Sequence, residues 1–474
     1  MNRLPPRAVL SILLACLGLA AGPARGQNQD AAPPFPQTVA EPPPPATAVG
    51  TTLEECYREA LQNNPAIRQA RMDVEGAVGA KLVFDSIALP HVGLGGLGGQ
   101  QGPRREAKKQ IFILITGTFD QALFNAAIPA TFRRGRIEVA LAEQKLNQTL
   151  IGQIFELRSA FYQALDAREG LAVQESVRDR LRANYDAQVQ QRQVGKVSNR
   201  EISQAKIQLA AIEPGLAAAR GAYRAAQIDL AQRLGRDIGP ETASQPGEGL
   251  PIPSGTLDGE AVRIDFAAET AYALSHRPDL MALREMIQAA KEDSAIAHDG
   301  YWPRLDLVAN GQYIPETAIA RSGSVNRGQS STQQSQILVG PSLTWTPYDG
   351  GTLQGQARTL DATRAAYQIQ LQSLEDQVPR DLQQIAASLQ KAAAQLEGSE
   401  SNVALADQNL KQVEAQVANG DLPQLDFINA QTNLLQAHFN RLNALLENSL
   451  AIAQFELVTG RYLEFAQKKA PDQP

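Results

Sequence analysis

The chain has 474 residues, of which 5% are aromatic and 20% are charged, and its formal net charge is -6. This length allows two or three ordinary domains or one large two-part structure, and the near balance of charges argues against a nucleic-acid partner, which a basic face would attract. The scarcity of aromatic side chains argues against a large globular core and favours closely packed, Ala-rich helices.

The first residues have the pattern of a secretory signal peptide. Arg3 and Arg7 form a positive segment, an apolar run follows from Ala8 to Gly22, and small residues then offer a cleavage site at Gly26. A segment of this kind is removed on export and does not stay as a membrane anchor. We therefore expect residues 1–26 to be a signal peptide.

Lipoprotein processing at Cys16 is an alternative, because Leu13 to Cys16 resembles a lipobox. Against it, the apolar run continues past Cys16 to Ala21, where a lipoprotein would turn polar. If Cys16 leaves with the signal, Cys56 is the only cysteine left and no internal disulfide can form. The helical pattern around Cys56 predicts a small buried side chain.

Residues 27–50 are predicted to be a linker, because their many prolines exclude helix and favour extended polyproline conformations. No later stretch approaches about 18 uninterrupted apolar residues, so the sequence predicts no transmembrane helix. An exported chain of this kind is soluble, lipid-anchored or part of an outer-membrane β-barrel.

An internal repeat organises the rest of the chain. Residues 52–90 (TLEECYREALQNNPAIRQARMDVEGAVGAKLVFDSIALP) match residues 265–303 (DFAAETAYALSHRPDLMALREMIQAAKEDSAIAHDGYWP) without a gap. The residues that recur at a constant offset of 213 are Ala60, Leu61, Pro65, Arg71 and Pro90. Each copy is predicted to be a helix that its last proline, Pro90 or Pro303, terminates.

Two segments of β character follow each opening helix, with a polar, glycine-rich loop between them. The predicted strands are His91–Leu97, Gln110–Phe119, Arg304–Tyr313 and Gln336–Trp345. Leu305, Leu307 and Ala309 alternate at the two-residue period of a strand. The second strand of each pair is more continuously apolar, so its two faces are less distinct.

Long helical hairpins follow the strands. From about residue 129 to 193 there is no proline, and apolar residues recur every three or four positions, as on one stripe of a helix. About 65 residues at 1.5 Å each make a rod of about 100 Å, far longer than an average globular helix. The chain turns near Gly195 and resumes as helix to about Gly235.

The second half repeats this plan. Its helix runs from about residue 353 to 418, with Pro379 expected to kink it, then turns near Gly420 and resumes to Gly460. Each half is thus helix, strand, strand and long helical hairpin. The expected domains are residues 51–238 (first repeat), 239–260 (linker), 261–464 (second repeat) and 465–474 (tail).

Four strands are too few to close a barrel, and lipid does not tolerate open sheet edges. The smallest bacterial membrane barrels have about 8 strands. If these strands enter a membrane, several chains must therefore contribute to one barrel.

The two halves resemble the repeats of the TolC-like outer-membrane factors, the outer membrane efflux protein family. The matching features are ALQNNPAI and ALSHRPDL in the opening helices, ALFN and TPYDGG between strand and helix, and the closing stretch from Ala418 to Gly460. The resemblance covers about residues 51–464. It implies a mainly α fold with a small β part, a homotrimer whose 12 strands form one outer-membrane β-barrel, and a periplasmic α-helical barrel below it.

The resemblance also implies the function: an outer-membrane channel subunit of a tripartite efflux or type I secretion system, working as a passive exit duct and not as an enzyme. Its partners would be outer-membrane lipid, a periplasmic adaptor protein and an inner-membrane pump. A soluble periplasmic coiled-coil scaffold or adaptor-like protein is the alternative, and it explains the hairpins but not the four strands. A secreted hydrolase is a third interpretation, but the sequence shows no set of residues in the pattern of a catalytic site.

The family's duct closes at the inner ends of the hairpins, where acidic residues line the constriction. Asp426 matches the first family aspartate, Asn429 stands where a second acidic residue is often found, and Glu201 is the counterpart of Asp426 in the first half. Three copies of a carboxylate near one axis would attract cations. The alternative is a solvated charge on a helix. The resemblance also implies a basic residue that helps to hold the duct closed, and at its position this chain has Leu422.

The turns of the hairpins are the expected adaptor contacts. They comprise Val194, Gly195 and Lys196 in the first half and Asn419, Gly420 and Asp421 in the second. Ordinary helix-ending turns are the alternative. The histidines are scattered without metal-ligand spacing, and no phosphate loop or hydrolase motif is visible, so we expect no catalytic residue, metal or cofactor.

Overall fold

The computed structural model describes residues 50–101, 110–193, 198–236, 249–257, 259, 264–314, 334–419 and 421–461. Contacts divide the chain into residues 1–48 and residues 49–474, and only the second unit contains described residues. The predicted signal peptide, most of the proline-rich linker and the C-terminal tail therefore lie outside the described residues.

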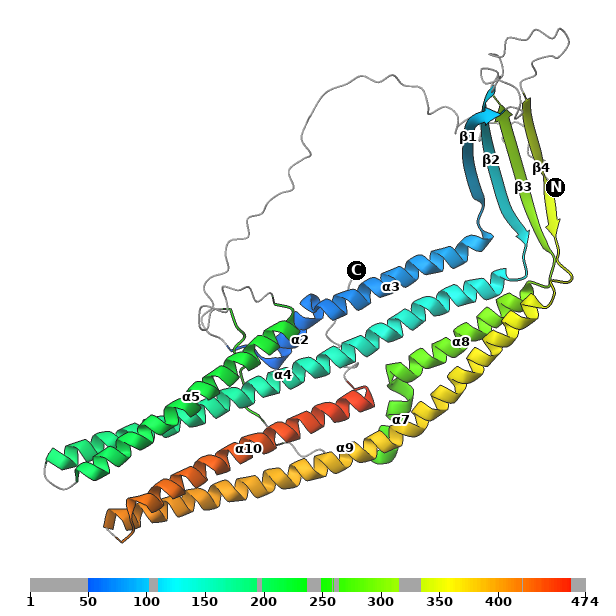
Figure 1. The fold of residues 1–474 in the computed structure, drawn as a ribbon. Helices are drawn as coiled ribbons and strands as arrows, with labels where there is room; N and C mark the ends of the chain where they lie inside the picture. The colour runs from blue at the N-terminus through cyan, green and yellow to red at the C-terminus, as the bar shows by residue number, and fades with distance from the viewer. Residues whose placement is uncertain are drawn as a thin grey trace, which may run out of the picture. The chain divides into compact units, whose positions relative to one another are not determined.

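Figure 1 shows the elements of the second unit. The first group is α2 (Leu53–Asn63), α3 (Pro65–Asp85), the 3-10 turn η1 (Ser86–Ala88), β1 (His91–Gln101), β2 (Gln110–Phe124), α4 (Ile128–Gln193) and α5 (Asn199–Leu234). The second group is α7 (Phe266–His276), α8 (Pro278–Asp299), β3 (Arg304–Ile314), β4 (Gln334–Thr344), α9 (Thr352–Asn419) and α10 (Gln424–Thr459). The chain is thus mainly helical with a small β part, as predicted.

Each opening helix was predicted as one element but is two. The break falls before Pro65 in the first group and before Pro278 in the second, because a proline begins a helix well but restricts the residue before it. Asn64 caps α3 by accepting hydrogen bonds from the backbone N–H groups of Ala66 (2.9 Å) and Ile67 (3.3 Å). Nor do the helices extend to Pro90 and Pro303: they end at residues 85 and 299, several residues earlier.

The four strands form one antiparallel sheet in the order β1-β2-β3-β4. All four predicted strands are present, but their ends differ. β2 continues five residues past the predicted Phe119, because residues 115–122 and 124 pair with β3, whereas pairing with β1 ends at Asp120. The register of this second ladder shifts between Ala122 and Phe124, just before its last pair, Phe124 with Leu305.

The helices lie side by side below the sheet in Figure 1. α4 packs against α3, α5, α8 and α10, and α9 packs against α8 and α10. The middle of the predicted stripe on α4 is buried, with Ile154, Phe161 and Leu165 each at most 3% exposed in a cluster that includes Cys56, and the rest of the stripe is half-buried. Cys56 is fully buried, as predicted, and burial raises the pKa of its thiol to about 12.

The long helices are as extended as the sequence predicts. α4 has 66 residues and α9 has 68, which at 1.5 Å per residue gives about 100 Å each. α9 continues through Pro379, and α5 contains Pro214 in the same way. Gly235 and Gly460 end their hairpins with φ of 78°, the left-handed geometry that glycine adopts at helix ends.

Part of the predicted linker, residues 249–257, lies along the helices. The Thr51 N–H donates to the carbonyl of Ile252 (2.7 Å), and Arg168 of α4 donates to the carbonyls of Pro253 and Gly255. Among the described helices, none is both long enough and apolar enough to span a membrane.

Candidate functional site

The sheet has one apolar face. In an antiparallel sheet, residues directly opposite each other share a face and alternate along each strand, so the register assigns every described position. The apolar face comprises Val92, Leu94, Gly96, Ile113, Ile115, Gly117, Phe119, Leu305, Leu307, Ala309, Gly311, Tyr313, Ile337, Val339, Pro341 and Leu343, and its polar members are Gln121 and Ser335. No charged residue lies among them, and many are highly exposed in the single chain, such as Leu94 at 84%.

The other face is polar. Its polar members are His91, Thr116, Thr118, Asp120, Arg304, Asp306, Asn310, Gln312, Gln336, Ser342 and Thr344, and its apolar members include Leu97, Leu114, Val308 and Leu338. Contacts confirm the assignment, because the Arg304 guanidinium donates to Asp306 Oδ1 (2.8 Å) and lies 3.4 Å from Asp120 Oδ1. A sheet with one apolar and one polar face suits a boundary between lipid and water.

The sheet also has two open edges. β1 and β4 each pair on one side only, so a row of backbone N–H and C=O groups on each has no partner in the described chain. An exposed strand edge of this length is normally paired, covered or charged. The sheet thus has an apolar surface and two rows of backbone groups without a partner in the described chain.

The predicted constriction residues lie at the other end of the long helices. Glu201 is in the first turn of α5 and Asp426 in the first turn of α10. Val194, Gly195, Lys196 and Gly420 lie outside the described residues, and Asn419 is the last residue of α9. Asp421 is exposed and Leu422 is half-buried.

Glu201 has a local structural role. Its carboxylate accepts a hydrogen bond from the Ser198 N–H (2.7 Å), and the Ser198 hydroxyl accepts one from the Glu201 N–H (3.4 Å), which is a capping box at the start of α5. The hydrogen bonds to Ser198 lower the pKa of Glu201 below its ordinary value. The side chain is exposed, so it also presents a negative charge to solvent.

Asp426 stands in the same place without such a cap. The residue before α10 that corresponds to Ser198 is Pro423, which has no side-chain donor or acceptor, and only the Asp426 backbone N–H bonds to it (3.0 Å). The Asp426 carboxylate accepts no hydrogen bond from the described residues. Asn429 is exposed nearly one turn further along α10. Asp426 is therefore the carboxylate available for another contact.

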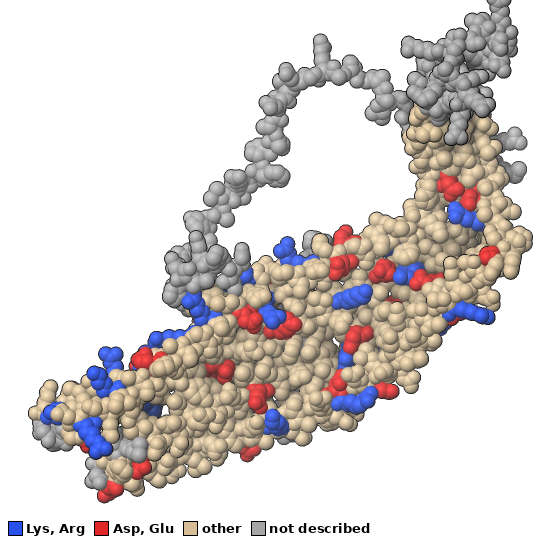
Figure 2. All heavy atoms as spheres, viewed as in Figure 1, with Lys and Arg blue, Asp and Glu red and all other residues tan. Residues whose placement is uncertain are grey.

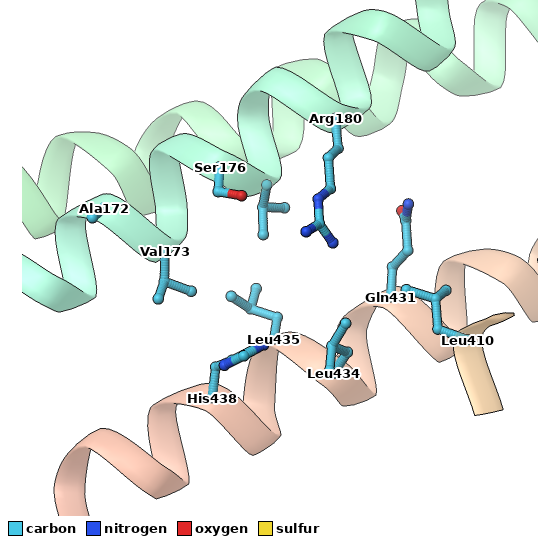
Figure 3. A pocket seen from close by; sticks show the side chains of 10 residues that line it. Ala172, Val173, Ser176, Arg180, Leu410, Gln431, Leu434, Leu435 and His438 are labelled. Atoms are coloured by element: carbon cyan, nitrogen blue, oxygen red, sulfur yellow. The ribbon is translucent and has the colours of Figure 1, made fainter. Parts of the chain in front are cut away.

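The sequence did not single out a groove between α4 and α10 (Figure 3), which has a volume of about 320 Å³. Its apolar lining is Val173, Val177, Leu410, Leu434 and Leu435. Arg180 points from α4 toward α10, and burial together with Arg441 and Arg180 lowers the pKa of His438 on its floor. The lining holds no acidic residue, so the groove suits an apolar or anionic group better than a cation. In sequence its residues look like ordinary core positions.

The described residues contain no group of three or more His, Cys, Asp or Glu side chains placed to hold a metal ion. The four histidines are far apart in the sequence, and only His438 lines a cavity described above. The candidate functional features are therefore the two-faced sheet, the long helices and the ends of the hairpins.

Comparisons with known proteins agree with this arrangement of a small sheet and long helical hairpins. The family described as outer membrane efflux protein matches the chain twice, over residues 56–236 and 271–461. Outer membrane protein TolC of Escherichia coli (strain K12) is 24% identical over 408 residues, which cover 83% of this chain and 78% of that protein.

Solved structures share the fold. CusC has a TM-score of 0.70 at 15% identity, covering 92% of this chain and 98% of its own. VceC of Vibrio cholerae has a TM-score of 0.66 at 19% identity, covering 86% and 96%. The MtrE outer membrane channel of Neisseria gonorrhoeae, solved in an open state, has a TM-score of 0.67 at 16% identity, covering 86% and 88%.

Proposed function

This chain belongs to the outer membrane efflux protein family, and we propose that it is the outer-membrane channel subunit of a tripartite efflux or type I secretion system. Family membership places it in the outer membrane as a transport channel. In our proposal it is a passive duct, to which an inner-membrane pump delivers substrate through a periplasmic adaptor protein.

The observation that carries the proposal is the two-faced sheet with two open edges. Lipid requires every backbone hydrogen-bonding group to be satisfied, so a four-stranded sheet cannot enter a bilayer alone. Three copies would supply twelve strands, joined where β4 of one copy meets β1 of the next. The apolar face would then contact lipid and the polar face would line the pore.

The long helices would carry the duct across the periplasm. Their length of about 100 Å suits a span of that kind. We assign residues 51–238 and 261–464 as tandem repeats joined by the linker at 239–260, because the order of helices and strands is the same in both segments. In a trimer the four long helices of each copy would form a helical barrel of twelve helices.

The ends of the hairpins would close the duct and meet the adaptor. We propose Asp426, Asn429 and Glu201 as the aperture, with Asp426 contributing most because its carboxylate has no partner within the described chain. The adaptor would contact the turns that contain Val194, Gly195 and Lys196 and those that contain Asn419, Gly420 and Asp421.

Fractionation of cells that express the full chain tests the proposal. We expect the protein in the outer membrane as an oligomer that dissociates to monomers on heating, and we expect the purified oligomer to conduct ions in planar bilayers. A monomer that is freely soluble in periplasmic extract, or an outer-membrane oligomer that does not conduct, would contradict the channel assignment.

A further inference from the structure

The groove between α4 and α10 lies between the two helical hairpins (Figure 3). α4 of the first hairpin contributes Val173 and Val177, α10 of the second contributes Leu434 and Leu435, and α9 contributes Leu410. Its volume of about 320 Å³ is at the lower end of the range for small-molecule pockets, roughly 300–1,000 Å³. A molecule bound here would therefore contact both hairpins at once.

The lining residues form one face of each helix. On α4 they recur at positions 173, 176, 177 and 180, and on α10 at positions 431, 434, 435 and 438. Spacings of this kind place side chains on the same side of a helix. Two such faces normally interdigitate as a core, but here they leave a gap, and Ser176 and Arg180 on its lining are exposed.

Three polar side chains of the groove are available to bind a ligand. Arg180 and Gln431 extend from opposite helices into the gap (Figure 3), and Ser176 lines it from α4. None of the three side chains makes a hydrogen bond or an ion pair with the described residues. A guanidinium has five N–H donors and no acceptor, and the amide and the hydroxyl can also donate. Groups of this kind bind the oxygen atoms of an anion.

The charges around the groove also favour an anion. The lining contains no acidic residue. Asp407 on α9 acts on His438, but its carboxylate is already paired with Lys411 Nζ at 2.6 Å. Burial, followed by Arg441 and Arg180, lowers the pKa of His438, so this ring is uncharged near neutral pH. The one charge among the described lining residues is then the guanidinium of Arg180.

The two ends of the groove differ in charge. Arg180 and Gln431 lie at the end nearer the hairpin turns, and His438 is seven residues further along α10, a distance of about 10 Å. Residues 178–193 of α4, which lead toward the turn, contain four basic and two acidic residues. Figure 2 shows Lys and Arg gathered at the end of the α4–α5 hairpin. The groove therefore has a positively charged end and an apolar end.

We infer that this groove binds a small amphiphilic organic anion, whose charged group contacts Arg180 and Gln431. Its apolar body lies against Val177 and Leu435, with the neutral ring of His438 at the far end. A cation would be repelled by the guanidinium, and a neutral molecule of the same shape would give its donors no ionised acceptor. The inference goes beyond the proposed function and does not depend on conduction through a pore.

Calorimetric titration of the purified full chain in phospholipid nanodiscs tests this site, with empty nanodiscs as the blank. The probe is naphthalene-2-sulfonate, because it is small and apolar and its sulfonate stays ionised at any ordinary pH. We expect saturable binding with a single molecule per chain. The neutral naphthalene-2-sulfonamide should bind about ten-fold more weakly, and 2-naphthylmethylammonium should not bind. Sulfonate that does not saturate, or that binds no better than the ammonium probe, would overturn the inference.

Two arginines of α4 show where the charged group binds. Arg180 and Arg182 are both exposed, but only Arg180 lines the groove. Arg180→Gln should weaken the binding of naphthalene-2-sulfonate about ten-fold, because it removes the positive charge that pairs with the sulfonate. Arg182→Gln is the matched control, since it removes the same charge from another side of the same helix, and affinity should stay unchanged. No loss in Arg180→Gln, or an equal loss in both variants, would contradict the site.

Protection of a cysteine from a maleimide locates the apolar body of the probe. Ser176→Cys places a thiol in the lining, and Ser203→Cys places one on α5, where it is exposed outside the groove. Cys56 can stay in place because it is fully buried. Saturating naphthalene-2-sulfonate should slow the reaction at position 176 several-fold and leave position 203 unaffected. Unchanged rates at both positions would mean that the probe binds elsewhere.

The outcomes separate this inference from the proposed function. A conducting outer-membrane oligomer without saturable binding of the sulfonate would overturn the site and leave the channel intact. A chain that binds the probe in the groove but does not conduct would overturn the channel assignment alone.

Discussion

Glu201 and Asp426 show how two equivalent residues acquire different roles. Both stand in the first turn of the second helix of a hairpin. Glu201 closes a capping box with Ser198, whereas Pro423 leaves Asp426 with no side-chain partner at the cap. The carboxylate of Glu201 is therefore shared between helix capping and any contact with solvent ions, and that of Asp426 is not.

This difference between Glu201 and Asp426 determines which variants test the aperture. Asp426→Asn with Glu201→Gln removes both charges while Gln at position 201 can still serve in the capping box. We expect the reconstituted channel to lose several-fold in cation over anion preference, with most of the loss from Asp426→Asn, because a ring of carboxylates concentrates cations. Reversal potentials measured across a salt gradient report the preference directly.

One control variant completes this test. Ser198→Ala should weaken the start of α5, at a cost of about 1 kcal/mol, while leaving both charges in place. Because the folded-state pKa of Glu201 is lowered, its contribution to stability is present above the pKa of the unfolded chain and is lost as pH falls through the folded value. Selectivity that stays the same after both charges are removed would reject the aperture assignment.

The sequence predicted that Glu201 and Asp426 lie near the hairpin turns, but not which hydrogen bonds their side chains make. The turn of each hairpin follows from glycine and from the end of the apolar stripe, and the structure places Glu201 and Asp426 in the first turn of the helix after it. The groove that includes His438 and Arg180 was missed, because it depends on how α4 and α10 diverge in space. Apolar periodicity on one helix carries no information about a gap between two helices.

At the scale of the elements, the sheet provides most of the structural support for the proposed function. Leu305, Leu307 and Ala309 were predicted from their alternation to share a face, and the register confirms it. β2 and β4 gave no such signal, because both of their faces include apolar residues. Their orientation became clear only from pairing with β3, which assigns each position to one side.

Two neighbours on β4 test this orientation with the same chemistry. Leu338 and Val339 are equally exposed in the single chain, at 62% and 63%, but lie on the polar and the apolar face respectively. Val339→Arg would place a charge in lipid at a cost of roughly 2–4 kcal/mol near the bilayer midplane. Leu338→Arg would place it in the water-filled pore at much less cost.

We therefore expect Val339→Arg to reduce the amount of heat-sensitive oligomer in the outer membrane and Leu338→Arg to leave it near the level of the unaltered protein. Equal loss in both variants would mean that the strand is packed on both sides. A loss confined to Leu338→Arg would mean that the faces are reversed.

The sequence of the opening helices was insufficient to predict where each helix begins and ends. The repeat at an offset of 213 placed each of them correctly, but each proved to be two helices. Pro65 and Pro278 recur between the two copies of the repeat but were not predicted as helix starts, although proline is well suited to that position. The predicted terminators Pro90 and Pro303 lie beyond the helices, next to the strands that follow.

At the scale of the whole molecule, the long helices separate two tasks. The sheet is suited to membrane insertion, and the hairpin ends are proposed to meet the adaptor. Helices of 66 and 68 residues lie between them. Because the contacts that hold the sheet and the contacts at the hairpin ends share no residues, a change at one end should leave the other intact.

Proline in the hairpin turns tests this separation. Gly195→Pro or Gly420→Pro should distort a turn, because proline fixes φ near -65° and removes a backbone donor. We expect transport by the complete system to fall strongly while the outer-membrane oligomer still forms, since the strands and their register are unchanged. Gly323→Pro is the matched control, because Gly323 falls between β3 and β4 in the sequence and outside both hairpin turns, so transport should persist. Substrate accumulation in cells measures transport, and heat dissociation of the oligomer measures assembly. Normal transport in both turn variants would mean that the hairpin ends do not dock the adaptor, whereas loss of the oligomer would mean that insertion and docking depend on each other.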